Sequence, residues 1–187
     1  SVRIEASTQL SKAEVEKLGF ITICTPFDEP SVDKVAAHGY DIIKIASASF
    51  GEWPLLEKIV QYDRPIIAST GGAKLETIDM VVSFLEHRKK QFALMHCVGQ
   101  YPVPEAELQF NQLTLLKERY PEITIGFSTH EAPDNFLAVA LAVAKGAGIF
   151  EKHVGIKSDQ YPLNGYSATP EQARKWLESA EQAYKMC

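Results

Sequence analysis

Hydrophobic and polar positions follow two different periods along the chain. Six short apolar segments rich in Ile, Val and Phe have the composition of buried strands. They cover residues 21–27, 41–47, 64–70, 92–98, 124–130 and 148–156. Segments with apolar residues every three to four positions lie between and after them and predict helices over residues 31–39, 53–61, 75–89, 110–120, 134–146 and 169–186. The pattern therefore predicts six successive βα units.

Local signals support several of these helices. Asp134 precedes one helix, and Thr169 with Pro170 and Glu171 opens the last one. Gly39 and Gly146 close two others. Before the first strand only residues 11–18 have a helical pattern. A complete (β/α)8 barrel has eight units, so we expect its first two strands to be missing from this chain or unrecognisable in it.

The polar residues within the strands distinguish two arrangements of parallel βα units, an open doubly wound sheet and a barrel. In five of the six predicted strands they gather at the C-terminal end: Thr25, Lys44, Ser47, Ser69, Thr70, His96, Ser128 and His130. All strand ends of a barrel face one shared mouth, whereas an open sheet uses chiefly the strands at its switch point. The expected fold is an α/β TIM (β/α)8-type barrel, incomplete in this chain, that forms one domain over residues 1–187.

Composition narrows the class of protein. The chain has 187 residues, of which 45% are hydrophobic and 23% charged, as in a globular protein with a sizeable core. The formal charge is −5, from 19 basic and 24 acidic residues, and no basic stripe indicates nucleic acid as a partner. No apolar run is long enough to cross a membrane, and residues 1–10 lack the pattern of a secretory signal. We expect a cytoplasmic protein with reduced thiols at Cys24, Cys97 and Cys187.

Ionisable residues interrupt the last apolar segment, IFEKHVGI at residues 149–156. Side chains alternate along a strand, so Glu151 and His153 share one face, as do Ser128 and His130 on the preceding strand. Two imidazoles at adjacent strand ends can bind a divalent metal and leave positions open for water and substrate. The alternative is a pair of hydrogen-bonded core histidines, and the sequence favours neither.

The adjacent pair His96 and Cys97 does not form a catalytic dyad on this reading. Neighbours on a strand point to opposite faces, so the imidazole cannot activate the thiol beside it. Cys97 is expected to be a small buried side chain.

A second group of residues suggests an anion site. Ser69, Thr70, Gly71 and Gly72 follow a strand with hydroxyl and backbone N–H groups, as a carboxylate or phosphate site requires. Lys44 interrupts an apolar strand and either extends to the surface or meets an anion. Hydroxyls at Thr25, Ser47, Ser69 and Ser128 would complete a phosphate site. The alternatives are a simple glycine turn and a surface lysine, and no P-loop fingerprint supports a nucleotide.

Six motifs together resemble a known family. In order they are CTPFDEPSVD, IIKIASASFGEWPLLEKI, RPIIASTGGAKLETI, LMHCVGQYPVPEAELQ, IGFSTH and FEKHVGI. Their order and spacing are similar to those of the barrel of N-acetylneuraminate (sialic acid) synthases, a family that includes pseudaminic and legionaminic acid synthases and a spore-coat polysaccharide protein.

The resemblance implies a metal-dependent transferase that condenses phosphoenolpyruvate with an N-acetylated aldose, within sialic acid-like carbohydrate biosynthesis. The metal is usually Mn²⁺, with Mg²⁺ and Co²⁺ as alternatives, and the family forms a homodimer. His130 and His153 match the metal ligands, and with Lys44 they would be the catalytic residues. The positions that match phosphoenolpyruvate-binding residues are Thr25, Lys44, Ser47, Ser69 and Ser128, while Tyr101 and Asn164 match the sugar-binding region.

The departures from the family fall mostly on the acceptor sugar. Ala48 and Ser49 replace a Gly-Glu pair whose Glu contacts the sugar, and Asn164, at the end of YPLN, replaces a sugar-binding Asp. Thr129 replaces the Asp of Ser-Asp-His, and Gly99 replaces a phosphate-contacting Asn. We also expect this chain to lack the family's C-terminal antifreeze-like domain.

The changes at Ser49 and Asn164 leave a second hypothesis open. A non-catalytic or regulatory barrel that binds a sugar phosphate would keep the anion site without the acceptor chemistry. A nucleotide-binding open sheet has little support, because no dinucleotide fingerprint is present.

Overall fold

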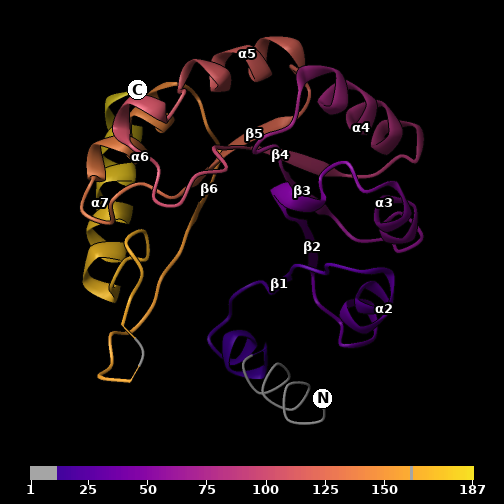
Figure 1. Cartoon of the computed structure of the whole chain (residues 1–187), viewed down its shortest axis with the longest axis horizontal. Coiled ribbons are helices and arrows are strands. Elements are labelled where there is room, and N and C mark those ends of the chain that lie inside the picture. The colour runs from indigo at the N-terminus through magenta and orange to yellow at the C-terminus, as the bar shows by residue number, and fades with distance from the viewer. Residues whose placement is uncertain (1–11, 161) are drawn as a thin grey trace. The chain divides into compact units, whose positions relative to one another are not determined.

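The computed structural model describes residues 12–160 and 162–187 (Figure 1). Three expectations touch residues outside that part: the absence of a secretory signal in residues 1–10, the first residue of the helix expected over 11–18, and Tyr161 in the YPLN motif. Residues 12–17 are helical, which agrees with the described part of that helix.

Strands and helices alternate along the described chain. The strands are β1 (Ile23–Cys24), β2 (Ile42–Ile45), β3 (Ile66–Ser69), β4 (Phe92–Cys97), β5 (Thr124–Thr129) and β6 (Ile149–Lys152). The helices are α2 (Glu29–Ala37), α3 (Trp53–Ile59), α4 (Leu75–His87), α5 (Asn111–Arg119), α6 (Phe136–Ala144) and α7 (Pro170–Met186). Two short 3-10 helices, η1 (Ser47–Ser49) and η2 (Glu105–Glu107), follow β2 and β4.

The order of the strands confirms the class of fold. Strands β1 to β6 are neighbours in chain order, and the pairs β1–β2, β2–β3, β4–β5 and β5–β6 are parallel. A barrel adds each strand beside the previous one, whereas a doubly wound sheet reverses its order at a switch point. The described residues thus have the α/β barrel type of fold, with six strands where a complete barrel has eight.

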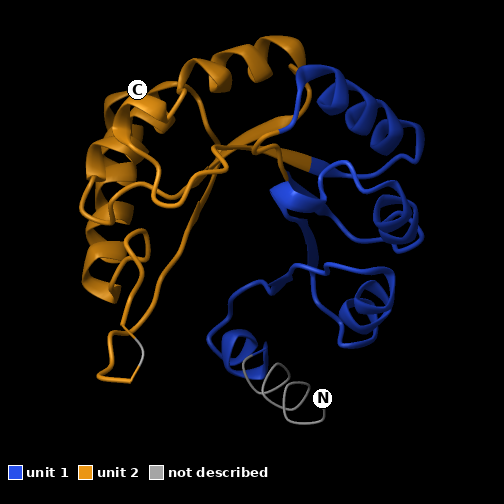
Figure 2. Ribbon diagram, in the orientation of Figure 1, with its two compact units in different colours: residues 1–68, 73–92 blue, residues 69–72, 93–187 orange. Residues whose placement is uncertain are grey.

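The chain divides into two compact units (Figure 2). Unit 1 consists of residues 1–68 and 73–92, and unit 2 consists of residues 69–72 and 93–187. The single domain expected over the whole chain remains a prediction.

In unit 1, strand β1 is much shorter than the predicted segment 21–27. Before it, the Asp41 carboxylate accepts the backbone N–H of Thr22 at 2.8 Å, and after it comes Pro26, which has no N–H to donate. These two features confine regular pairing to Ile23 and Cys24. Helix α2 then begins at Glu29, because the Asp28 side chain accepts the Ser31 N–H at 2.8 Å.

In unit 2, strand β5 lies between β4 and β6 with little space at one position. A Cβ atom on Gly126 would lie 2.6 Å from the carbonyl oxygen of Ile149 and would also collide with the Met95 sulfur. Glycine therefore allows the close approach of the three strands that carry the polar residues described below.

Helices α6 and α7 pack against each other beside β6 (Figure 1). Their shared core contains Val139, Val143, Trp176, Ala180 and Ala183, and Phe150 of β6 packs against it. The predicted opening of α7 is confirmed, since Thr169 and Gln172 form a capping box.

The predicted start of α6 is wrong by one residue. The cap is Asn135, whose side chain accepts the Ala138 N–H, and not Asp134. Both closing glycines are confirmed, because Gly39 and Gly146 have φ values of 71° and 82°, which side chains disfavour.

Strand β6 is also shorter than the predicted segment 148–156. It ends at Lys152, and Val154 and Ile156 are 55% and 80% exposed. Val154 instead forms an isolated bridge with Ala168, so the chain leaves the sheet immediately after Lys152. Among the described residues, we find no helix with the length and apolar character needed to span a bilayer.

Candidate functional site

The two histidines predicted as a pair lie close together in unit 2. His130 follows the last residue of β5, and His153 follows the last residue of β6. The register pairs Ser128 with Glu151, so the two strands end at the same level. The centroids of the two imidazole rings are 5.1 Å apart. Two residues 23 positions apart in the sequence thus present their rings at one place.

The two rings differ in their surroundings. His130 is buried, whereas His153 is exposed. Burial, with the nearby His153 as the second cause, lowers the pKa of His130 to about 4. His130 is therefore a neutral imidazole at physiological pH, and this is the form that binds metals.

Two tyrosines flank the histidines. The Tyr101 ring lies 4.2 Å from the His130 ring, and the Tyr166 ring lies 5.7 Å from His130 and 5.2 Å from His153. The tyrosine rings are 5.4 Å apart. Burial raises the pKa of Tyr101, which keeps its hydroxyl protonated. The four rings form a surface that combines imidazole nitrogens with aromatic faces.

Tyr166 was not predicted as a site residue. It stands in a loop without periodicity, and the only signal was its position two residues after Asn164. The Asn164 side-chain oxygen accepts backbone N–H groups of Tyr166 and Ser167, at 3.2 and 2.8 Å. Asn164 therefore shapes the turn that carries Tyr166, and its amide N–H₂ is the part still able to meet a ligand. Its predicted role in sugar binding remains a prediction.

His96 and Cys97 point to opposite faces of β4, as predicted. The His96 Nε2 atom is 2.9 Å from the Leu108 carbonyl oxygen, and the ring stacks on Phe127 at 6.0 Å. His96 is thus a buried core histidine outside the four-ring cluster, although it was counted among the polar strand ends. Cys97 is buried, and its Sγ is 3.8 Å from Nδ1 of His130, a partner just after the next strand.

The serine-rich turn after β3 agrees only in part with a phosphate site. Thr70 donates both its N–H and its hydroxyl to the Met95 carbonyl, at 3.0 and 3.2 Å, so its hydroxyl is already used. The Ser69 hydroxyl is buried and has no hydrogen-bond partner among the residues that the structure describes. A buried hydroxyl usually has a partner, so Ser69 fits a ligand contact. Ser128 is 3% exposed, at the end of β5.

The remaining predicted residues belong to unit 1. Thr25 follows β1, Lys44 lies within β2, and Ser47 begins η1. Lys44 is only 8% exposed, which excludes the alternative of a lysine that extends to the surface. Ser49, at the position of the family's glutamate, is buried in η1, and its N–H donates to the Ala46 carbonyl. The anion-binding roles of Thr25, Lys44 and Ser47 remain predictions.

A buried ion pair lies beside the histidines in sequence. Lys152 Nζ is 2.9 Å from Glu131 Oε1, and the two side chains are 3% and 1% exposed. Burial raises the pKa of Glu131, and the Lys152 charge opposes this effect. The second oxygen of Glu131 has no hydrogen-bond partner within the described part of the chain. From the sequence, Lys152 stood out only as one of the ionisable residues within segment 149–156, and Glu131 was not singled out.

The donor set is compatible with a divalent metal. Imidazole is a ligand of several divalent first-row metal ions, and His130 and His153 supply two imidazole rings. Across residues 12–160 and 162–187, no cluster of three or more His, Cys, Asp or Glu side chains has metal-binding geometry. Two protein ligands would leave several positions open for water and substrate, which is the arrangement of a catalytic rather than a structural metal.

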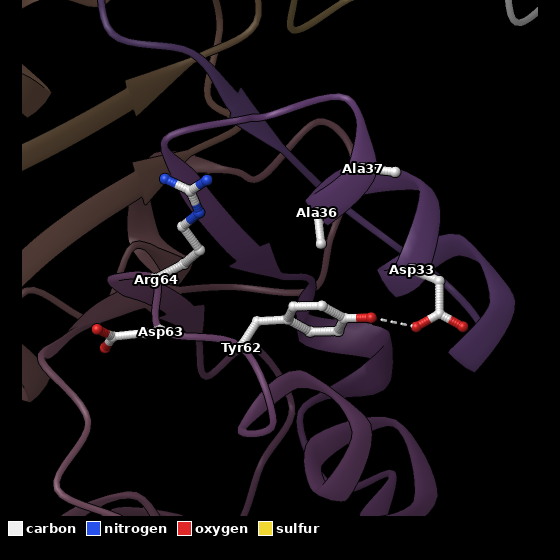
Figure 3. Close-up of a pocket in the computed structure, with 6 residues that line it drawn as sticks. All are labelled: Asp33, Ala36, Ala37, Tyr62, Asp63 and Arg64. Carbon is white, nitrogen blue, oxygen red and sulfur yellow. Dashed lines mark hydrogen bonds between the residues drawn. The ribbon is translucent and has the colours of Figure 1, made fainter.

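An open pocket of about 470 Å³ occurs in unit 1 (Figure 3). It is lined by Asp33, Ala36, Ala37, Tyr62, Asp63 and Arg64, none of which is a predicted site residue. Lys58 and, as the second cause, the Tyr62 hydroxyl both contact the Asp33 carboxylate and lower its pKa. The Asp33 carboxylate is therefore already paired, and the pocket gives no sign of a catalytic role.

Comparison with known proteins supports the resemblance. The NeuB family model matches residues 2–187. A crystal structure from Chromobacterium violaceum, of a protein named for spore coat polysaccharide biosynthesis, has a TM-score of 0.95 and 52% identity over 97% of this chain and 54% of that one. The N-acetylneuraminic acid synthetase of Leptospira borgpetersenii, crystallised with citrate, has a TM-score of 0.89 and 31% identity over 97% and 63% of the two chains.

A curated relative agrees with these structures. The N,N'-diacetyllegionaminic acid synthase of Campylobacter jejuni is 29% identical over 91% of this chain and 51% of its own. The chain thus spans between about half and two thirds of the length of these relatives. The match to the family model covers all six motifs from which the resemblance was inferred, and the chain belongs to the NeuB family.

Proposed function

We propose that this protein condenses phosphoenolpyruvate with an N-acetylated aldose to form a sialic acid-like nonulosonic acid and inorganic phosphate. The observation that carries the proposal is the pairing of His130 and His153, 5.1 Å apart at adjacent strand ends, in a chain of the NeuB family. The same place offers aromatic faces at Tyr101 and Tyr166, which suit the apolar faces of a sugar.

The proposed reaction balances without a redox partner. Carbon 3 of phosphoenolpyruvate forms a bond to the aldehyde carbon of the sugar, water adds at carbon 2, and phosphate leaves. His130 and His153 would hold a divalent ion, Mn²⁺ by preference, with Mg²⁺ or Co²⁺ as alternatives. Such an ion supplies Lewis-acid polarisation of the aldehyde oxygen when bound. Lys44 and the hydroxyls of Thr25, Ser47, Ser69 and Ser128 would hold the phosphoenolpyruvate anion in orientation.

Acceptor preference is expected to differ from that of an ordinary sialic acid synthase. Ionised carboxylates only accept hydrogen bonds, whereas Ser49 and Asn164 can also donate. A polar site rejects a sugar that leaves its buried groups unpaired. The exchange of two carboxylates should therefore shift the preference away from N-acetylmannosamine.

A phosphate-release assay tests the proposal. Phosphoenolpyruvate and Mn²⁺ are supplied at saturation with a panel of N-acetylated aldoses that includes N-acetylmannosamine. We expect phosphate release that requires both the ion and an aldose, stops with EDTA, and is fastest with an aldose other than N-acetylmannosamine. Thermal stabilisation by phosphoenolpyruvate without turnover of any aldose would instead favour the non-catalytic sugar phosphate-binding barrel.

Lys44→Met provides a sharper test of the anion site. The substitution keeps most of the side-chain length and removes the charge, so phosphoenolpyruvate should lose a charge-assisted hydrogen bond worth about 1.5–3 kcal/mol. By calorimetry at low salt, affinity is expected to fall about 10- to 100-fold. The matched control is Lys175→Met, which removes an exposed ion pair on α7. A change of less than twofold at Lys44 would exclude it as an anion contact.

Cellular location and assembly follow the same proposal. We propose that the protein acts in the cytoplasm, where phosphoenolpyruvate is available, and that it forms a homodimer as the family does.

A further inference from the structure

The buried pair Glu131–Lys152 connects the two chain segments that carry the histidines. Glu131 directly follows His130, and Lys152 directly precedes His153. Lys152 Nζ donates to Glu131 Oε1 at 2.9 Å and also to the Glu131 backbone carbonyl at 3.2 Å. One ammonium group thus binds both the side chain and the main chain of the residue after His130.

The side chain of Lys152 points to the face of β6 opposite His153, because side chains alternate along a strand. Glu151 and His153 lie on one face of the strand, and Phe150 and Lys152 lie on the other. Phe150 packs on the core of α6 and α7, so the ion pair lies on the helix-facing side and not among the four rings. It therefore reaches the histidines through the backbone and not as a ligand.

Stability alone does not explain this pair. Both side chains are at least 97% buried, and the second Glu131 oxygen has no partner in the described residues. Two well-packed apolar side chains of similar volume are often as stabilising as a buried ion pair, or more so. A charge pair that gives little net stability can still define one geometry.

Two backbone hydrogen bonds complete the restraint. The Val103 N–H donates to the carbonyl of His130 at 3.0 Å, and the Ala168 N–H donates to the carbonyl of His153 at 2.8 Å. The carbonyl of His130 is thus held by the segment between β4 and α5, and that of His153 by the segment before α7. The ion pair joins the residues next to these two histidines.

We propose that Glu131 and Lys152 are positioning residues that set the separation and orientation of the His130 and His153 imidazoles for a divalent ion. This inference rests on the proposed function, because it assumes that the two rings bind such an ion. Groups that hydrogen-bond directly to metal ligands commonly change metal affinity 10- to 100-fold when they are replaced, and a pair that acts through the backbone is expected to reach the lower end of this range.

The test uses Glu131→Met/Lys152→Met, which replaces both charged groups by apolar side chains of roughly similar volume. Mn²⁺ affinity is measured by calorimetry, Co²⁺ coordination by visible absorption, and folding by thermal denaturation. We expect a melting temperature close to that of the parent, an Mn²⁺ affinity at least about tenfold lower, and an altered Co²⁺ spectrum. The control Glu178→Gln removes an exposed ion pair with Arg174 on α7 and should change none of these readouts.

Each further outcome has a defined meaning. A folded double variant with the parent's affinity and spectrum overturns the positioning role and leaves the proposed function standing. A parent protein that binds neither ion overturns the metal assignment, and this inference with it. If the double variant does not fold, Lys152→Arg decides, because it keeps the charge but changes the donor geometry. An altered Co²⁺ spectrum then supports the role, and an unchanged one overturns it.

Discussion

Replacement of both His130 and His153 by alanine is expected to abolish Mn²⁺ binding. The centroids of the two rings are 5.1 Å apart, and His130 is held neutral by its low pKa, so one of its ring nitrogens has a lone pair that can bind a metal. Loss of both ligands should cost more than the roughly 100-fold limit seen for outer partners. Calorimetric titration with Mn²⁺ measures this loss, and phosphate release should disappear in parallel.

The fold should survive this double substitution. His153 is exposed, and of the two rings only that of His130 leaves a void. Far-ultraviolet circular dichroism should therefore remain that of the parent. The matched control is His87→Ala, which removes an exposed histidine at the end of α4. If the double variant bound Mn²⁺ as tightly as the control, the ion would have other ligands and the site would be wrongly assigned.

The second large effect is expected at Trp176, in the core between α6 and α7. Trp176 is 5% exposed and meets the Phe150 ring edge-on at 6.1 Å. Truncation of a buried tryptophan to alanine typically costs about 3–5 kcal/mol. Trp176→Ala should therefore lower the free energy of unfolding of unit 2 by that amount, measured by urea titration with circular dichroism.

Trp176→Phe should lower the free energy of unfolding much less than Trp176→Ala, and this contrast separates the loss of apolar contact from the effect of the indole N–H. The indole N–H is buried without a hydrogen-bond partner among the described residues. Phenylalanine loses some apolar contact but removes that unpaired donor, so the net change is expected to stay within about 1 kcal/mol. The half-exposed Trp53 is the control, and Trp53→Ala should cost less than Trp176→Ala. Equal losses for the alanine and phenylalanine variants would show that the indole N–H has a partner such as water.

The sequence predicted the order and type of the elements well, because buried parallel strands and amphipathic helices have distinct periods. Strand ends were less predictable. Before β1, the Asp41 carboxylate accepts the Thr22 N–H in place of a strand carbonyl. After Lys152, the chain leaves the sheet and Val154 pairs with Ala168. Both effects come from contacts outside the strand's own pattern. The cap of α6 was predicted at Asp134 but lies at Asn135, because two adjacent residues offer similar side-chain acceptors.

In the site, the alternation of side chains along the two predicted strands was sufficient to predict that His130 and His153 lie close together. Tyr166 could not be found this way, because a loop has no period from which to infer where a ring points. The pair Glu131–Lys152 joins residues 21 positions apart, and no local pattern matches one buried charge with another. Cys97 was judged only against its neighbour His96, whereas the histidine that it contacts is His130, just after the next strand.

The bridge between Val154 and Ala168 has a consequence for how specificity can change. It closes a loop that carries Asn164 and Tyr166, and its hydrogen bonds join only main-chain atoms: the Ala168 N–H to the His153 carbonyl, and the Gly155 N–H to the Ala168 carbonyl. Main-chain bonds tolerate most changes of side chain. Under the proposed function, the segment between these positions is therefore an exchangeable loop whose sequence can change which sugar is accepted, while His130 and His153 stay in place after β5 and β6.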